Sequence, residues 1–121
     1  MPGGEQIARA LALIAALETE TLSLKQLVDR IELVSRSPQE TRAILDAATR
    51  RGLIDRDGSQ IAIRDRSVAP ALSPDVVVRA GDFECRRCGR QLAEGHFITL
   101  AGGEVGPFGA TCVGRVLSGR P

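Results

Sequence analysis

Aromatic residues, histidine and cysteine are all scarce in this chain of 121 residues. It contains no Trp, no Tyr, a single His and only three Phe. The three Phe lie in the last third of the sequence, together with all three Cys. The length allows one ordinary domain or two very small ones. Because the aromatic and sulfur chemistry is confined to one end of the chain, we predict two modules.

Other absences exclude whole classes of protein. The longest nearly apolar stretch, Ile7 to Leu17, is interrupted by Arg9 and is too short to cross a bilayer. Glu5 is the only charged residue before Ile7, whereas a signal peptide begins with basic residues. Three Cys are an odd number, which argues against a secreted disulfide framework. We therefore expect a cytoplasmic protein without a membrane segment.

Excess charge and catalytic motifs are also missing. Sixteen Lys and Arg against fifteen Asp and Glu give a net charge of +1, so no overall field attracts a polyanion. With a single His in the sequence we identify no Ser/His/Asp catalytic triad, and we find no glycine-rich phosphate-binding loop. The Cys pair precedes the His, which is the reverse of the order in zinc nucleobase deaminases. We expect no enzymatic activity and identify no small-molecule substrate.

Three helices are predicted in the first half of the chain. Apolar residues at helical spacing predict a helix over residues 5–18; they are Ile7, Leu11, Ile14 and Leu17. Ser23 can cap a second helix, whose apolar face carries Leu24, Leu27, Val28 and Ile31. The third helix has the clearest start, with Ser37 as N-cap, Pro38 at the first position and Glu40 for a reciprocal hydrogen bond. Gly52 ends it.

The first helix has a wider apolar face than one small core requires. Ala12, Leu13 and Ala16 fall outside its main stripe. One interpretation is that this extra face packs on the carboxy-terminal module. The other is a homodimer through the Ile7–Leu17 helix, which many regulators of palindromic DNA sites use.

A β-hairpin follows the third helix. Leu53 and Ile54 open a strand, Asp57-Gly58 is a strong turn signal, and alternating apolar residues continue to Ile63. Three helices followed by a hairpin is the order of a winged helix-turn-helix. The stretch from Leu22 to Ile54 resembles the prokaryotic winged-helix transcription regulators, and the resemblance covers about residues 5–66. It predicts a winged helix-turn-helix domain over residues 1–66.

The resemblance implies that duplex DNA is a partner. In that family the third helix enters the major groove and the wing contacts the backbone. On the outward face of this helix, which also carries Ala43, Gln39 can pair with adenine and Arg42 with guanine. The phosphate contacts implied by position are Arg50, Arg51, Arg56 and Arg64.

The charge of this module keeps a second function open. Residues 1–66 hold ten Lys and Arg and ten Asp and Glu, a net charge of zero. Asp46 lies on the predicted reading helix, and Asp55 and Asp57 flank the turn of the wing. Duplex binding draws most of its free energy from neutralising phosphates. The alternative is a protein–protein interaction adaptor that uses the same scaffold without binding DNA.

The second module contains the most specific motif of the chain. Residues 67–75 form a linker rich in Pro, Ser and Ala, and a strand then begins a Cys-containing zinc-binding module over residues 76–121. Two Cys spaced as Cys85-x-x-Cys88 can bind one metal ion, and Gly89 permits a positive φ that points amides at the sulfurs. This pattern is the zinc knuckle of zinc ribbons and treble clefs.

The remaining residues follow the treble-clef order. A hairpin is predicted over residues 97–105 and a turn over residues 106–109. Cys112 is predicted to be a metal ligand in the first turn of a short helix, where free backbone amides favour the thiolate. Treble clefs usually take two ligands from this helix. Gly109 and Arg115 stand where the second Cys would be, which excludes a four-cysteine site.

A closed zinc site therefore needs one further ligand besides the three Cys. His96, the only His, is the predicted fourth ligand, and the competitors are Asp82, Glu84, Glu94 or a water molecule. Without metal the three thiols would be small apolar side chains, which is less favoured because so small a module has little core. The sequence predicts zinc bound by Cys85, Cys88, His96 and Cys112.

The aromatic and basic residues of this module each allow two interpretations. The three Phe are predicted to form the core around the knuckle, and the alternative is a stacking platform for single-stranded nucleic acid. Arg86, Arg87 and Arg90 can bind phosphate or balance the charge of the thiolates.

The two modules together define the predicted fold and function. Over nearly its whole length the chain looks like an uncharacterised archaeal family of small winged-helix proteins with a zinc-finger tail. The predicted fold class is α+β, with an N-terminal winged helix and a small zinc-ribbon or treble-clef-like module. The predicted function is that of a small DNA-binding transcription regulator with a structural zinc site.

Overall fold

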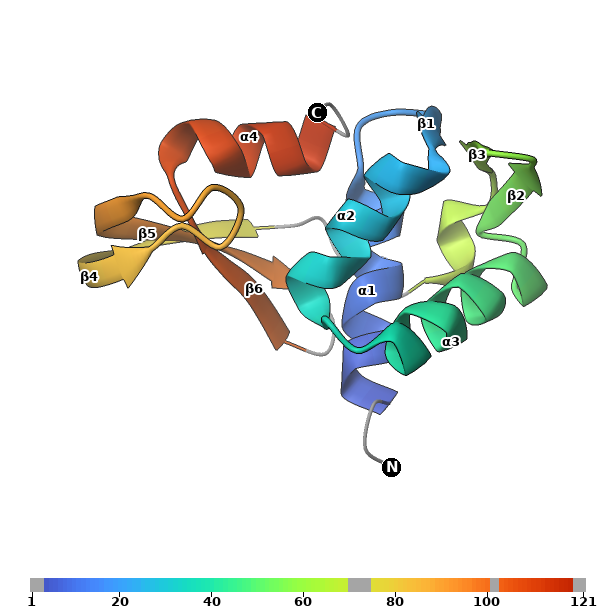
Figure 1. The fold of residues 1–121 in the computed structure, drawn as a ribbon, viewed down its shortest axis with the longest axis horizontal. Helices are drawn as coiled ribbons and strands as arrows, with labels where there is room; N and C mark the ends of the chain where they lie inside the picture. The colour runs from blue at the N-terminus through green and yellow to red at the C-terminus, as the bar shows by residue number, and fades with distance from the viewer. Residues whose placement is uncertain (1–3, 70–74, 101–102, 119–121) are drawn as a thin grey trace.

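The computed structural model describes residues 4–69, 75–100 and 103–118 and has an α+β fold (Figure 1). Within those residues the helices are α1 (Gly4–Ala16), α2 (Leu24–Val34), α3 (Pro38–Arg50) and α4 (Ala110–Ser118), with a short 3-10 helix at Arg66–Val68. The strands are β1 (Thr21–Ser23), β2 (Ile54–Asp57), β3 (Gln60–Ile63), β4 (Asp75–Glu84), β5 (Gln91–Leu100) and β6 (Gly103–Phe108). They form two antiparallel sheets, ordered β1-β3-β2 and β4-β5-β6. No helix in this part of the chain is long and apolar enough to cross a membrane.

The predicted caps account for the helix boundaries, with one correction. The Ser23 side chain accepts a hydrogen bond from the amide of Gln26, and the Ser23 amide donates to the Oε1 of Gln26, which makes a capping box. Ser37 likewise accepts from the amide of Glu40. The predicted reciprocal bond, from the Ser37 amide to the Glu40 carboxylate, is wrong, because the Ser37 amide donates to the Ser35 hydroxyl instead.

The first sheet contains the predicted hairpin and one strand that was not predicted. β2 and β3 pair around a turn in which Gly58 has a φ of +61°. β1 adds to the other edge of β3, with Leu22 opposite Ile61. Both of these residues are buried. A strand of three residues is too short to show a period of two, which is why the sequence pattern did not reveal it.

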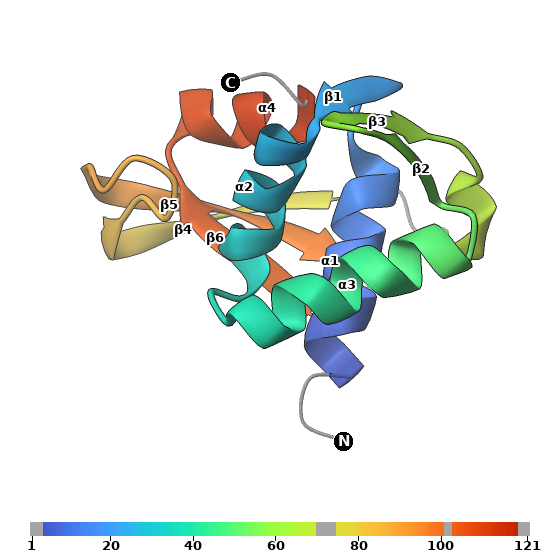
Figure 2. The same ribbon diagram turned by 45° about the vertical axis from the view of Figure 1, so that its right-hand side comes forward.

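The wide apolar face of α1 is covered within the chain. Every residue from Ala10 to Ile14 is buried, including Ala12 and Leu13, which lie outside the main stripe. Figures 1 and 2 show α1 between the first sheet and the second, and it contacts α2 and α3 as well as β5 and β6. The extra apolar face is therefore buried within the chain, and the homodimer through the Ile7–Leu17 helix stays a prediction.

The second sheet begins where the predicted linker ends. Of residues 67–75, the structure places 67 and 68 in the short 3-10 helix, buries Ala69 and begins β4 at Asp75; residues 70–74 lie outside the described residues. The predicted β5–β6 hairpin is present, with Leu100 opposite Gly103. The turn expected at residues 106–109 is wrong, because β6 continues to Phe108, opposite His96.

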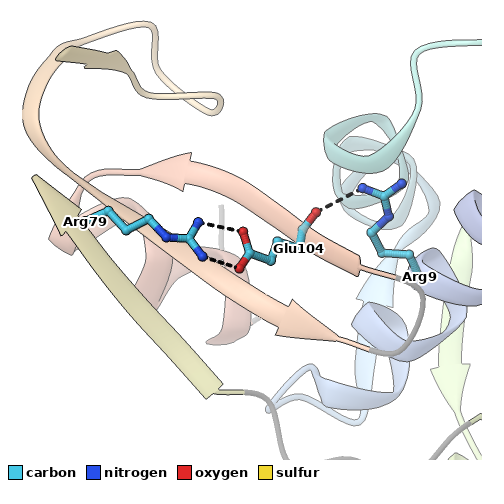
Figure 3. Close-up of polar contacts among 3 residues, drawn as sticks. All are labelled: Arg9, Arg79 and Glu104. Atoms are coloured by element: carbon cyan, nitrogen blue, oxygen red, sulfur yellow. Dashed lines mark hydrogen bonds and ion pairs between the residues drawn. The ribbon is translucent and has the colours of Figure 1, made fainter. Parts of the chain in front are cut away.

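The two halves of the chain share one hydrophobic core and several polar contacts. Arg9 of α1 donates to the carbonyl oxygen of Glu104 in β6 at 2.9 Å (Figure 3). The Glu18 amide donates to the Leu117 carbonyl at 2.7 Å. These contacts fix the second sheet and α4 against α1.

The three Phe occupy two different environments. Phe108 is fully buried in the core. Phe83 and Phe97 are half-buried and meet edge to face, with ring centroids 5.5 Å apart, and the Arg79 guanidinium lies 4.8 Å from the centroid of Phe97. The prediction that all three Phe form one core therefore holds only for Phe108.

Candidate metal centre

The connection between β4 and β5 forms a tight knuckle around the first Cys pair. The Cys85 amide donates to the Arg90 carbonyl and the Gly89 amide to the Cys85 carbonyl, both at 2.8 Å. Gly89 has a φ of +77°, as the motif predicted. A further bond from the Arg86 amide to the Pro107 carbonyl attaches the knuckle to β6.

The third Cys comes from α4. Cys112 lies in the first helical turn, and its sulfur is 3.7 Å from that of Cys88. The sulfurs of Cys85, Cys88 and Cys112 all lie within 4.8 Å of one another, and all three are free thiols. Three such thiols form a group that can hold a metal ion. Tetrahedral coordination with metal–sulfur bonds of about 2.3 Å places two sulfurs about 3.8 Å apart, close to the Cys88–Cys112 distance.

Burial and hydrogen bonding act in opposite directions on the buried thiols. Burial raises the pKa of Cys85, but amides of Cys88, Gly109 and Arg87 donate to its sulfur and together lower the pKa from 9.0 to about 7. Burial raises the pKa of Cys112. A bound cation would favour the thiolate at both positions, because a coordinating thiol loses its proton.

Of the three knuckle arginines that the sequence offered to balance the thiolates, Arg87 is the one that contacts a sulfur. Its Nη1 lies 3.8 Å from the Cys112 sulfur and donates to it. Three thiolates around a divalent cation carry a net negative charge, which this guanidinium partly balances. Arg86 also lies between the two Cys of the motif, so the sequence alone did not show which arginine contacts a thiol.

His96 is not part of this cluster. It lies in the middle of β5, opposite Val78 and Phe108, and neither ring nitrogen joins the group formed by the three sulfurs. Its Nδ1 is buried and has no hydrogen-bond partner among the described residues. The competing carboxylates Asp82, Glu84 and Glu94 are exposed and also lie outside the group. The structure thus brings together three of the four predicted metal ligands.

The residues predicted to contact DNA are all on the surface. Gln39 and Arg42 are exposed in the first half of α3, and Ala43 beside them is half-buried. The predicted phosphate contacts follow the end of α3 and the first sheet, and each is exposed; they are Arg50, Arg51, Arg56 and Arg64.

Two of these arginines already pair with carboxylates. Arg50 forms an i,i+4 ion pair with Asp46 at 3.1 Å, and Arg64 lies 3.9 Å from Asp55. Such exposed pairs contribute little to stability. They do reduce the positive charge that this face presents to a polyanion.

The chain is similar to a known protein family. A model of a family of unknown function, DUF5830, matches residues 6–120. No curated protein and no solved structure matches the chain.

Proposed function

The chain belongs to the family of unknown function DUF5830, and we propose that this member binds duplex DNA through an N-terminal winged helix, beside a module that a zinc ion stabilises. The observation that carries the proposal is the exposed first half of α3, with Gln39 and Arg42, in a helix–strand–helix–helix–hairpin order. A small transcription regulator is the function that fits this arrangement best.

The topology of the first sheet supports a winged helix. The short strand β1 pairs with β3 and so joins the segment between α1 and α2 to the hairpin. This sheet supports α3, whose inward residues Ile44, Ala47 and Ala48 are buried. The outward residues of α3 therefore remain available to a partner, and the β2–β3 hairpin would act as the wing.

Zinc fits the metal centre better than other ions. Thiolates are soft ligands that select zinc, copper(I) or iron–sulfur clusters over calcium and magnesium. Two ligands on a tight knuckle and a third in the first turn of a helix are typical of structural zinc sites. A water molecule is the simplest fourth ligand, since Cys85, Cys88 and Cys112 are the only donors that the described residues bring together.

A protein–protein interaction adaptor is the second candidate. The ion pairs Arg50–Asp46 and Arg64–Asp55 favour it, because they leave the predicted DNA-binding face close to neutral. An adaptor would bind its partner in a salt-insensitive manner, whereas binding to phosphates weakens steeply as salt increases.

Fluorescence anisotropy with a labelled random duplex tests the proposal. The zinc-loaded chain should bind at low salt with a dissociation constant of roughly 10⁻⁶ M or tighter, and this affinity should fall steeply towards physiological salt. Arg42→Ala should weaken the binding. Arg115→Ala, which removes an exposed arginine from α4, is the matched control and should not. Absence of binding at low salt would overturn the DNA proposal in favour of the adaptor.

A further inference from the structure

A cleft of about 650 Å³ lies between α2, the Cys knuckle and α4. Four arginines line it: Arg30 and Arg36 on and just after α2, and Arg86 and Arg87 on the knuckle. α2 and the β4–β5 connection are far apart in the sequence, and both lie below α4 in Figures 1 and 2. The cleft exists only because the two halves of the chain pack together.

The charges of facing guanidiniums act on one another in two pairs, Arg30 with Arg87 and Arg86 with Arg36. The pKa of Arg30 is lowered mainly by burial and also by the positive charge of Arg87. The pKa of Arg86 is lowered mainly by burial and also by the charges of Arg36 and Arg9. Two carboxylates, Asp29 and Glu32, also line the cleft. Four positive and two negative side chains leave a net charge of +2 on its lining, in a protein whose total net charge is +1.

We propose that this cleft binds a small ligand that carries a phosphate group. Arginine presents a planar fork of donors that matches phosphate oxygens in pairs, and arginines from two facing elements can contact one phosphate from both sides. A volume of about 650 Å³ is in the usual range for small-molecule sites. Leu33 and Val116 add apolar lining against which the organic part of the ligand can pack.

The shape of the site favours a small ligand over a nucleic acid backbone. The phosphates of a duplex form continuous rows along its surface, whereas these arginines gather around one cleft that Val116 of α4 also lines. Asp29 and Glu32 would repel a continuous row of phosphates, but they can accept hydrogen bonds from hydroxyl or amino groups of a compact ligand. This inference is independent of the proposed DNA binding, which depends on α3.

Isothermal titration calorimetry with adenosine monophosphate (AMP) and inorganic phosphate tests the inference. The full chain should bind AMP at low salt, and adenosine, which lacks the phosphate, should not bind. The double variant Arg36→Ala/Arg86→Ala should weaken AMP binding at least about tenfold, the effect of losing one hydrogen bond to a charged group. Both residues are partly exposed, and Arg86→Ala keeps the backbone amide that donates to the Pro107 carbonyl.

Arg90→Ala is the matched control, because Arg90 belongs to the same knuckle but does not line the cleft. AMP binding that Arg36→Ala/Arg86→Ala weakens and Arg90→Ala leaves unchanged supports the proposal. Absence of AMP and phosphate binding, or equal effects of both variants, overturns it. If only duplex DNA binding is weakened by the double variant, the phosphate that these arginines contact belongs to the nucleic acid, and the small-ligand proposal is wrong. Thermal melts of each variant verify that it is folded.

Discussion

Arg9 and Glu104 are 95 positions apart in the sequence, yet the Nη1 of Arg9 donates to the Glu104 carbonyl oxygen at 2.9 Å. The carboxylate of the same Glu104 accepts two hydrogen bonds from Arg79, at 2.8 and 2.6 Å (Figure 3). Glu104 thus connects α1 through its backbone and β4 through its side chain. The two halves of the chain are joined at this residue of β6.

We expect Arg9→Ala to destabilise the whole chain and not only its first half. Loss of a half-buried, charge-assisted hydrogen bond should lower the free energy of unfolding by about 1–2 kcal/mol. Chemical denaturation followed by circular dichroism measures this value. Lys25→Ala, at an exposed position of α2, is the control and should change it by less than about 0.5 kcal/mol. Two separate transitions in the wild-type chain would contradict a shared core.

Arg66 should be one of the most important polar residues for stability. Its Nη1 donates to the carbonyls of Ala15 and Leu17 at 2.8 and 2.6 Å, and its Nη2 to Thr19 at 2.8 Å. These carbonyls lie at and beyond the end of α1, where helical partners are lacking. Arg66→Ala should cost about 2–3 kcal/mol of unfolding free energy, since three charge-assisted bonds are lost.

Lysine should not replace Arg66. A single ammonium group cannot reach three carbonyls in the geometry of the guanidinium fork. We therefore expect Arg66→Lys to recover less than half of the loss caused by Arg66→Ala, measured in the same denaturation experiment. Full recovery would mean that only the charge of this residue matters.

The ion pair between Arg79 and Glu104 should make part of the stability depend on pH. The hydrogen bonds from Arg79 lower the pKa of the Glu104 carboxyl below its usual 4.5. The stabilisation is therefore fully present above pH 4.5 and is lost as the pH falls through the lower pKa of the folded state.

Glu104→Gln should consequently have a lower melting temperature than the wild type at pH 7, and the difference should shrink as the medium is acidified below pH 4.5. Circular dichroism melts between pH 7 and pH 3 measure it. Glu94→Gln, at an exposed glutamate of β5 without an ion pair among the described residues, is the control. A difference that stays constant over this pH range would contradict the assignment.

Zinc should bind in a ratio of about one ion per chain and depend on all three Cys. Cys88 is exposed, so Cys88→Ser should not disturb packing. We expect this variant to lose zinc and to melt at the same temperature as wild type treated with a chelator. Elemental analysis and thermal melts check both results.

His96→Ala distinguishes the sequence-based ligand set from the cluster in the structure. Because the imidazole lies outside the group of three sulfurs, this variant should retain its zinc. Loss of zinc from His96→Ala would restore His96 as the fourth ligand.

Local signals in the sequence determined much of this protein. Ser23, Ser37, Gly52, Gly58 and Gly89 each act over a few residues, through a capping bond or a backbone angle, and each is found where its pattern predicted. The same holds for the Cys85-x-x-Cys88 spacing, which orients two thiols through one short turn. Such features depend only on the backbone angles and hydrogen bonds of a few neighbouring residues.

Only the tertiary structure decided the features that depend on how elements pack. The sequence could not choose between a homodimer and an internal neighbour for the wide apolar face of α1, which the structure buries within the chain. It could not separate Phe108 in the core from Phe83 and Phe97, or show that His96 lies away from the sulfurs. The sequence also did not reveal that Arg30 and Arg36 line the same cleft as Arg86 and Arg87. These relationships join residues that are tens of positions apart, and no local backbone preference acts over that separation. They are determined by the burial of apolar surface between α1, α4 and the second sheet.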